Sequence, residues 1–326
     1  MIKNQWFAIL ESKEVKTQPV GVLRLNEKLV LWRDDNGLNC IYDKCCHRGA
    51  SLALGKIVDN HIECPFHGFR FDQKGEVKLI PANGKSAKVP NSFKVNAYKV
   101  VDAYGFIWLW NGDYDDADES QINFFEELKE GYLYDTFSET WNVHYTRAIE
   151  NQLDVVHLPF VHASTIGKGN KTIVNGPVVK WEENLMTFYV DNIKDDGKTI
   201  AKKTKEITDY ENYFSLQYQV PNIWQNIISD QVRIFAAFVP VDNQNTKIYL
   251  RFYQNFLTIP VLGQLITSMG NLFNRKVLHQ DRRVVITQIP KYSELKMKEK
   301  LIPGDLPIIE FRKKLHQLGS ESTKSE

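Results

Sequence analysis

Up to about Gly112, apolar positions come in short runs separated by turn-forming residues such as Asp34-Asp35-Asn36-Gly37. Runs of this length, bounded by Gly, Asn and Asp, are typical of strands in a small all-β domain. We therefore predict strands at Val20–Leu25, Leu29–Arg33, Val89–Val101 and Tyr104–Trp110. The acidic stretch Gly112–Glu119 is predicted to be a solvated linker.

Beyond that linker, the hydrophobic pattern predicts longer elements of two kinds. Apolar and polar residues alternate along three stretches, which indicates a larger antiparallel sheet: Met186–Asp191, Tyr213–Val220 and Lys247–Phe256. Helical periodicity is clearest in four places: Ile122–Leu128, Asn142–His157, Gln264–Ile289 and the region near the C-terminus. The chain is therefore predicted to be an α+β protein, with an all-β domain at 1–112, a second domain at 113–319 and a flexible Ser/Lys/Glu-rich tail at 320–326.

Composition and charge narrow the functional classes. The chain has 326 residues, 43% of them hydrophobic, which is enough for two domains with their own cores. With 41 Lys+Arg against 40 Asp+Glu, it lacks the excess of basic residues that nucleic acid binding requires. No apolar run approaches the ~18 residues of a membrane span, and the N-terminal residues lack the features of a secretory signal. We therefore expect a cytoplasmic protein that binds neither nucleic acid nor a membrane.

All four cysteines fall in one short window, as Cys40, Cys45, Cys46 and Cys64. Disulfides are rare in reducing compartments, and two adjacent cysteines make a two-bridge framework awkward. The sequence reads Cys45-Cys46-His47 in one stretch and Cys64-Pro65-Phe66-His67 in the other, so each offers a thiolate and an imidazole. Two loops of this kind are typical of a metal site.

Zinc and free thiols are the two alternatives to weigh for these stretches. Zinc fingers group like ligands at spacings of about 2–4 and 3–5 residues, whereas each stretch here mixes the two types. Buried free thiols beside surface histidines would explain one such stretch better than they explain two.

The paired stretches resemble the Rieske 2Fe–2S motif, in which two Cys hold one iron and two His hold the other. This resemblance implies the ligands Cys45, His47, Cys64 and His67, with Cys46 at a position where the family more often has Pro or a small residue. Cys40 is predicted to be a packed strand thiol and His61 a surface turn residue. Two neutral imidazoles in place of two thiolates raise the reduction potential of the cluster from about −400 mV, typical of all-cysteine clusters, towards about −150 to +300 mV. Such a potential suits a cluster that accepts electrons from a ferredoxin or flavin.

A second metal site is predicted in the run from Glu150 to His162. Asp154 and His157 are three residues apart and would share one face of a helix. His157 and His162 are five apart, a spacing that a regular helix would spread around its surface. Pro159 disfavours helix at the residue before it, so the chain can turn and both imidazoles can converge on one metal ion.

A third ligand is needed, and Asp281 is the candidate. Two histidines and one carboxylate form the facial triad that leaves positions open on Fe(II) for oxygen. In the helix predicted at Gln264–Ile289, Asp281 lies in the middle of the apolar stripe made by Val277, Leu278, Val284 and Val285. A buried carboxylate needs a partner, and the alternative partner to a metal ion is a buried Arg.

The spacing Asn151-x2-Asp154-x2-His157-x4-His162, downstream of the paired Cys and His, resembles the catalytic core of the Rieske non-heme iron oxygenases. The run NQLDVVHLPFVHASTIG and the segment HQDRRVVITQ are similar to the short branch that includes vanillate and dicamba O-demethylases. The resemblance implies that a helix-grip catalytic domain follows the Rieske domain and that the protein is a homotrimer. It also implies that Asp154 connects a Rieske histidine of one subunit to an iron-ligating histidine of the next, with Asn151 as an orienting residue.

The resemblance implies a monooxygenase that hydroxylates or oxidatively demethylates a small organic substrate. O2 is the co-substrate, and electrons come from NAD(P)H through a separate ferredoxin or flavin reductase. The residues support an external donor, because no GxGxxG follows a strand and the two remaining thiols are too few for a second all-Cys cluster. The alternatives are a ring cis-dihydroxylating dioxygenase and a Rieske electron-transfer or sensor protein with an inactive second domain.

Overall fold

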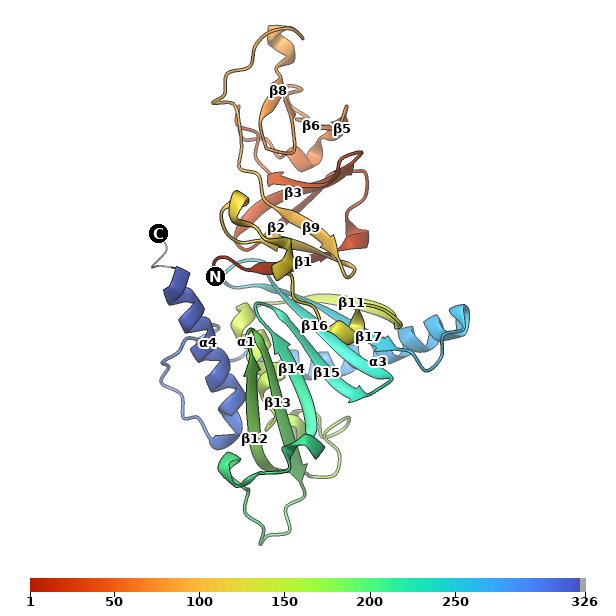
Figure 1. The fold of residues 1–326 in the computed structure, drawn as a ribbon, viewed down its shortest axis with the longest axis vertical. Helices are drawn as coiled ribbons and strands as arrows, with labels where there is room; N and C mark the ends of the chain where they lie inside the picture. Colours follow the sequence, from red (N-terminus) through yellow and green to blue (C-terminus); the bar gives the residue numbers. More distant parts are fainter. Residues whose placement is uncertain (323–326) are drawn as a thin grey trace. The chain divides into compact units, whose positions relative to one another are not determined.

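The computed structural model describes residues 1–322. Apart from the first two residues, it divides into two compact units, one of residues 3–123 and one that begins at Phe124 (Figure 1). This division falls later than the boundary predicted after Gly112. The intervening acidic segment belongs to the first unit because Trp110 Nε1 donates to the carbonyl of Asp113 at 3.0 Å, and Trp6 Nε1 donates to the carbonyl of Asp118 at 2.8 Å.

The first unit is all-β, as predicted. Its ten strands are β1 (Trp6–Glu11), β2 (Val20–Arg24), β3 (Glu27–Asp34), β4 (Gly37–Tyr42), β5 (Lys56–Val58), β6 (His61–Glu63), β7 (Arg70–Phe71), β8 (Val77–Leu79), β9 (Val100–Ala103) and β10 (Phe106–Trp110). They form three antiparallel sheets in the orders β1-β10-β9, β2-β3-β4 and β5-β6-β7-β8. The sheet β5–β8 and the end of β4 frame the two Cys/His loops.

The strand predicted at Val89–Val101 is wrong for most of its length. Only its end lies in a strand, β9. Pro90 has no N–H to donate to a ladder, and the carbonyl of Pro90 instead accepts from Phe93 N at 3.0 Å in a turn. Residues after this turn make only isolated bridges, such as Ala97 with Ile41.

The second unit is built on one antiparallel sheet with helices beside it, which confirms the α+β fold (Figure 1). The sheet has the order β11-β17-β16-β15-β14-β13-β12. Its strands are β11 (Leu133–Trp141), β12 (Ile173–Glu182), β13 (Leu185–Ile193), β14 (Phe214–Gln219), β15 (Ile223–Ser229), β16 (Val232–Pro240) and β17 (Thr246–Gln254).

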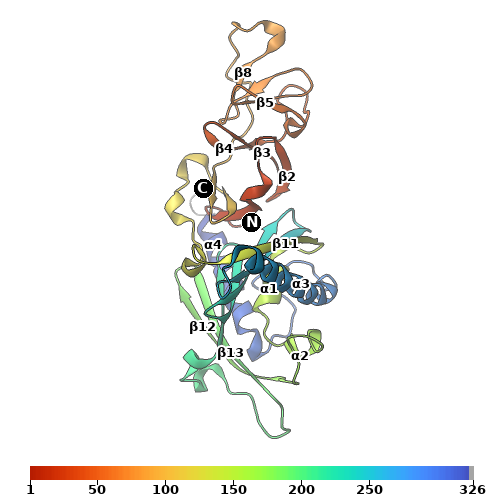
Figure 2. The same ribbon diagram turned by 90° about the vertical axis from the view of Figure 1, so that its right-hand side faces the viewer.

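The helices of this unit are α1 (Tyr145–Leu153), α2 (Leu158–Val161), α3 (Pro260–Val285) and α4 (Leu306–Ser322). Helix α3 packs against β11 and β17 and contacts both α1 and α2 (Figure 2). Close approach to the sheet requires Gly270, because a Cβ there would lie 2.6 Å from the ring of Phe252. Among residues 1–322, no helix is both long and apolar enough to cross a lipid bilayer.

The helix predicted at Ile122–Leu128 is wrong, since only a short 3-10 turn forms, at Glu126–Leu128. Phe124 and Phe125 are adjacent, and both rings pack on Phe235, with centroids 5.4 and 6.1 Å away. Two consecutive side chains point in directions about 100° apart on a helix, whereas the extended backbone at Phe125 lets both rings reach the same neighbour. Buried packing therefore overrides the local periodicity.

At the C-terminus, the predicted flexible tail and the structure differ. Residues 320–322 continue helix α4. The rest of the predicted tail, 323–326, lies outside the described residues.

Candidate metal centres

The two Cys/His loops of the first unit have the same backbone construction. Cys45 N donates to the carbonyl of Ala50 and Cys64 N to that of Phe69, both at 2.8 Å. Four residues after each cysteine, a glycine N–H returns to the cysteine carbonyl, at 2.9 Å from Gly49 and 3.0 Å from Gly68. These glycines have φ of 76° and 73°, which side chains with a Cβ rarely adopt. The two loops are therefore closed in the same way, although the Cys–His spacings differ.

The loops bring all four predicted cluster ligands to one place. The rings of His47 and His67 lie 4.7 Å apart between centroids, and His47 stacks on Phe69 at 4.9 Å. Cys45 and Cys64 are buried, whereas both histidines are exposed. The thiol side of the pair thus faces the core, and the imidazole side faces solvent.

The chemistry of the thiols fits a resident metal cluster. Burial, helped by the nearby Cys64, raises the pKa of Cys45 to about 11. A protonated thiol is a poor ligand, and a bound iron ion would displace the proton. Cys46 is exposed, and Cys40 is buried in β4, as predicted for a packed strand thiol.

The histidines of the second centre lie at the two ends of the one-turn helix α2. Helix α1 ends at Leu153, and His157 and His162 flank the segment Leu158–Val161. Leu158 is helical, so the prediction that Pro159 breaks the helix there is wrong. Proline is tolerated in the first turn of a helix, where its missing N–H needs no partner. A single turn between the two residues directs both imidazoles to the same side.

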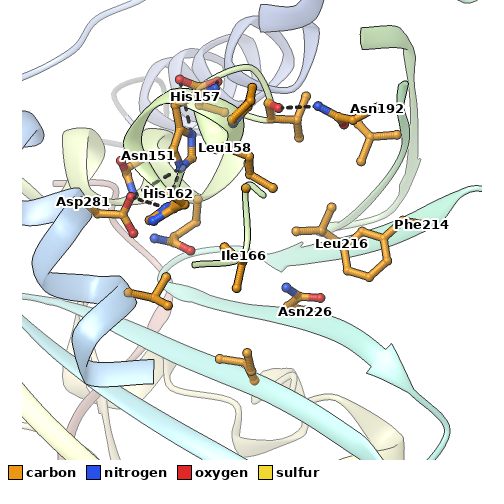
Figure 3. Close-up of a pocket in the computed structure, with 18 of the residues that line it drawn as sticks. Asn151, His157, Leu158, His162, Ile166, Asn192, Phe214, Leu216, Asn226 and Asp281 are labelled. Atoms are coloured by element: carbon orange, nitrogen blue, oxygen red, sulfur yellow. Dashed lines mark hydrogen bonds and ion pairs between the residues drawn. The ribbon is translucent and has the colours of Figure 1, made fainter. Parts of the chain in front are cut away.

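Asp281 completes the arrangement from helix α3 (Figure 3). The Nε2 atom of His162 lies 2.9 Å from Asp281 Oδ1, and the Nε2 atom of His157 lies 3.3 Å from the same oxygen. The three ligand atoms all lie within 4.8 Å of one another, so they could hold one metal ion. Asp281 and His162 are only 4% and 1% exposed, respectively, and no Arg partner to Asp281 is found among the described residues.

Electrostatics favour a cation between these groups. Burial alone would lower the pKa of His157, but the hydrogen bonds and charges of Asp154 and Asp281 outweigh burial and raise it to about 9. Burial alone would raise the pKa of Asp281, but its two histidine partners lower it. The carboxylate is thus held ionised in a buried place, and within residues 1–322 its Oδ1 atom lies near both imidazoles without a well-aligned hydrogen bond. A divalent ion would satisfy this charge.

Asp154 lies beside His157, but not on a shared helix face as predicted. It follows the end of α1, and its Oδ1 accepts from the backbone N–H of Val156 at 2.7 Å. Such an Asx turn ends a helix by offering the backbone an alternative acceptor. The other oxygen, Oδ2, faces His157 Nδ1 at 3.7 Å. Asn151 lies on the last turn of α1, and its Nδ2 atom is buried with no hydrogen-bond partner among residues 1–322.

A cavity of about 490 Å³ opens at this centre. Apolar side chains from the sheet and from α3 form much of its lining, among them Leu216, Ile234, Leu250 and Val277. Phe214 and Trp224 also line it, and sequence reasoning missed them because an aromatic residue on a strand is more often part of the core.

Sequence reasoning also missed Gln280 and Thr165. His162 Nδ1 lies 2.9 Å from Gln280 Oε1, which accepts from Thr165 Oγ1 at 2.7 Å. The sequence did place Gln280 directly before Asp281 and Thr165 three residues after His162. Polar residues at such positions are usually on the surface, so neither residue was predicted to belong to the site.

Comparisons with known proteins agree with both halves of this description. Residues 5–99 match the Rieske [2Fe-2S] domain. Residues 141–321 match the vanillate O-demethylase oxygenase C-terminal domain. The second match covers more than half of the chain.

Two curated relatives illustrate the similarity. The chain is 32% identical over 201 residues to the vanillate O-demethylase oxygenase subunit of Pseudomonas sp. (strain HR199 / DSM 7063), covering 59% of this chain and 54% of that protein. It is 27% identical over 305 residues to methylxanthine N1-demethylase NdmA of Pseudomonas putida, covering 92% of this chain and 82% of that protein. The chain thus spans about half the length of the vanillate subunit, and 31% of Protein TIC 55 of Arabidopsis thaliana.

Solved structures share the fold. NdmA of Pseudomonas putida CBB5 has a TM-score of 0.81 at 23% identity, covering 98% of this chain and 92% of that chain. Dicamba monooxygenase bound to dicamba has a TM-score of 0.74 at 18% identity, covering 99% of each chain. The fold agrees with the two domain matches, and those matches show that the chain belongs to the Rieske non-heme iron oxygenases that carry the vanillate O-demethylase oxygenase C-terminal domain.

Proposed function

We propose that this chain is the oxygenase component of a multicomponent monooxygenase that hydroxylates or oxidatively demethylates a small organic substrate. The observation that carries the proposal is the meeting of His157, His162 and Asp281 at the wall of a cavity of about 490 Å³. Cavities of this size suit ligands from small aromatic compounds upward. Because the three residues line this cavity, a metal ion that they held would adjoin the space for a substrate.

In this proposal, His157, His162 and Asp281 would hold a mononuclear iron. When bound, an Fe(II) ion of this kind supplies O2 activation at its open positions. The apolar lining excludes water and orients the substrate, so that the reacting bond lies near the triad. Asp281 contributes the negative charge that the two neutral imidazoles lack.

We assign the ligands of the 2Fe–2S cluster to Cys45, Cys64, His47 and His67. The two buried cysteines would anchor the cluster to the core, and the two imidazoles are exposed, where an electron donor could approach them. The donor is a separate ferredoxin or flavin reductase that draws on NAD(P)H. A homotrimer is part of the proposal, with Asp154 between His157 of one subunit and a Rieske histidine of its neighbour.

The decisive experiment replaces one mononuclear ligand at a time. Asp281→Ala and His162→Ala are expected to abolish substrate-dependent O2 consumption while the absorbance and reduced-state EPR signal of the cluster persist. Wild-type protein is expected to hold two cluster irons and one further iron per chain. Turnover that survives either substitution, or zinc as the sole metal, would refute the proposal.

A substrate screen with a matched reductase then separates the possible reactions. Oxidative demethylation releases the methyl carbon as formaldehyde, and hydroxylation retains all carbon in a product with one added oxygen. A product with two added hydroxyls would instead identify a dihydroxylating dioxygenase. Reduction of the cluster without any product from the screened compounds, in a protein lacking the third iron, would favour an electron-transfer protein.

A further inference from the structure

Gln280 contacts the face of His162 that points away from the proposed metal. The Nε2 atom of His162 points toward Asp281, and its Nδ1 atom lies 2.9 Å from Gln280 Oε1. Gln280 and Asp281 are consecutive on α3. One turn of this helix therefore supplies partners to both nitrogens of the same imidazole, the carboxylate at Nε2 and the amide at Nδ1.

Two further hydrogen bonds hold the amide of Gln280 in place. Its Oε1 atom accepts from Thr165 Oγ1 at 2.7 Å, and its Nε2 atom donates to Ser164 Oγ at 3.1 Å. Both partners come from the segment that follows His162. The amide is thus fixed by the same stretch of chain that carries the histidine, with its carbonyl oxygen toward the imidazole.

The direction of this amide determines which nitrogen of the imidazole carries the proton. A histidine that binds a metal through Nε2 must keep the lone pair there, and its proton then lies on Nδ1. Only an acceptor can face that N–H, and Gln280 presents its carbonyl oxygen. With the amide reversed, an N–H would face Nδ1 and would stabilise the tautomer that cannot bind metal through Nε2.

The two histidines of the triad differ in this respect. His157 Nδ1 faces a carboxylate, Asp154 Oδ2, at 3.7 Å. His162 Nδ1 faces a neutral amide at hydrogen-bond distance. His162 is 1% exposed, so the Gln280 amide rather than solvent meets its Nδ1 atom in this structure.

We propose that Gln280 is a positioning residue for the mononuclear centre, which fixes the tautomer and ring orientation of His162 through its Oε1 atom. The inference rests on the proposed metal site of His157, His162 and Asp281. Partners of this kind to a metal-ligating histidine typically change metal affinity by about 10–100-fold when they are removed.

The test measures binding of Co(II) to full-length protein that retains its cluster but lacks the mononuclear ion. Visible absorption of the bound Co(II) gives the Kd and also reports the ligand geometry. Gln280→Leu removes the acceptor, and Gln280→Glu keeps an acceptor at the same place. Gln264→Leu makes the same chemical change at an exposed position of the same helix.

We expect Gln280→Leu to raise the Kd about 10–100-fold, while Gln280→Glu and Gln264→Leu stay close to the wild-type value. A wild-type Kd for Gln280→Leu would overturn the inference. So would an equal loss in Gln280→Glu and Gln280→Leu, because both remove the N–H that donates to Ser164, and the loop rather than the imidazole would then be the target. If wild-type protein bound Co(II) no better than Asp281→Ala, the proposed metal site would be refuted, and the role of Gln280, which depends on that site, would be refuted too.

Discussion

Asp154 uses its two carboxylate oxygens for two different tasks. Oδ1 closes the turn after α1 by accepting from the backbone N–H groups of Val156 and His157, at 2.7 and 3.3 Å. Oδ2 faces the imidazole of His157 at 3.7 Å. Asparagine can retain the first task but not the charge of the second, whereas alanine loses both.

Asp154→Asn is therefore expected to retain the fold and both metals, yet to slow oxidation of the pre-reduced cluster by O2 and substrate about 10–100-fold. Stopped-flow absorbance of the cluster measures this rate. Asp154→Ala is expected to show the same kinetic defect and, in addition, to lose about 1 kcal/mol of stability with the turn. Normal turnover by Asp154→Asn would exclude Asp154 from the electron path.

His144 gives a prediction about pH. It is partly buried, its Nδ1 atom lies 2.8 Å from Thr146 Oγ1, and burial lowers its pKa to about 4. In the unfolded chain, His144 has the ordinary histidine pKa of 6.5, whereas in the folded chain its pKa is about 4. Between pH 6.5 and pH 4 the unfolded state therefore binds more protons at His144 than the folded state does. The free energy of unfolding falls as the pH is lowered through this range.

We expect His144→Asn to reduce the loss of unfolding free energy between pH 6.5 and 4, an effect of up to about 3 kcal/mol. Urea unfolding at a series of pH values measures it. His316 is exposed, and His316→Asn serves as the matched control because it makes the same substitution outside the core. An identical slope in wild-type protein and His144→Asn would show that other groups cause the acid sensitivity.

At the scale of elements, a buried ion network joins α1 to α4. Arg147 Nη1 and Arg312 Nε bind the two oxygens of Glu150 at 2.9 and 2.6 Å. Glu299 extends the network by contacting both arginines, at 2.6 and 2.8 Å. Because α1 also carries Asn151 and leads directly into Asp154, this network holds the segment that leads into the proposed metal site.

Arg312→Met is expected to lower the free energy of unfolding by about 3 kcal/mol, because it leaves a buried carboxylate with one partner fewer. Urea unfolding at neutral pH measures the change. Lys313→Met removes a neighbouring cation that pairs with Glu310 at 2.7 Å on the surface, and a change below about 1 kcal/mol is expected there. Equal effects of the two substitutions would mean that the buried network adds nothing beyond a surface pair.

The elements also show what the sequence could and could not predict. Asp281 was found because a carboxylate inside the apolar stripe of a long helix needs a partner, and that argument uses only local periodicity. The helix at Ile122–Leu128 was wrongly predicted because Phe124 and Phe125 pack on Phe235, a contact that depends on distant strands. Gln280 was missed for the same reason, since its partners Ser164 and Thr165 lie more than a hundred residues away.

For the whole molecule, the proposed trimer can be tested by mixing defective chains. The chain mass is 37.8 kDa, and light scattering is expected to give three times this value. Cys64→Ala is expected to lack the cluster, and Asp281→Ala to lack the mononuclear iron, so each is inactive alone. If electrons cross between subunits, co-expressed chains should recover about a quarter of wild-type activity, because random assembly pairs an intact cluster with an intact neighbouring iron at one interface in four.

Recovery in the mixed protein would have no explanation within a single chain, since no chain holds both intact centres. The controls are Cys64→Ala and Asp281→Ala, each expressed alone and prepared in the same way. A trimer without recovery would mean that each chain uses its own cluster, and the intersubunit position of Asp154 would be abandoned.

The separation of the triad along the chain has a consequence for folding. His162 and Gln280, the residue before Asp281, are 118 positions apart, so an ion bound by the triad acts as a cross-link that closes a very long loop. An unfolded chain would first have to close this loop, at a cost of about 4–5 kcal/mol of conformational entropy for about 100 residues in the simplest polymer treatment. The folded chain pre-arranges these ligands, whereas an unfolded chain must bring them together for each ion that it binds. Loss of iron is therefore expected to weaken the connection between α3 and the α1–α2 segment, and unfolding is expected to release the ion.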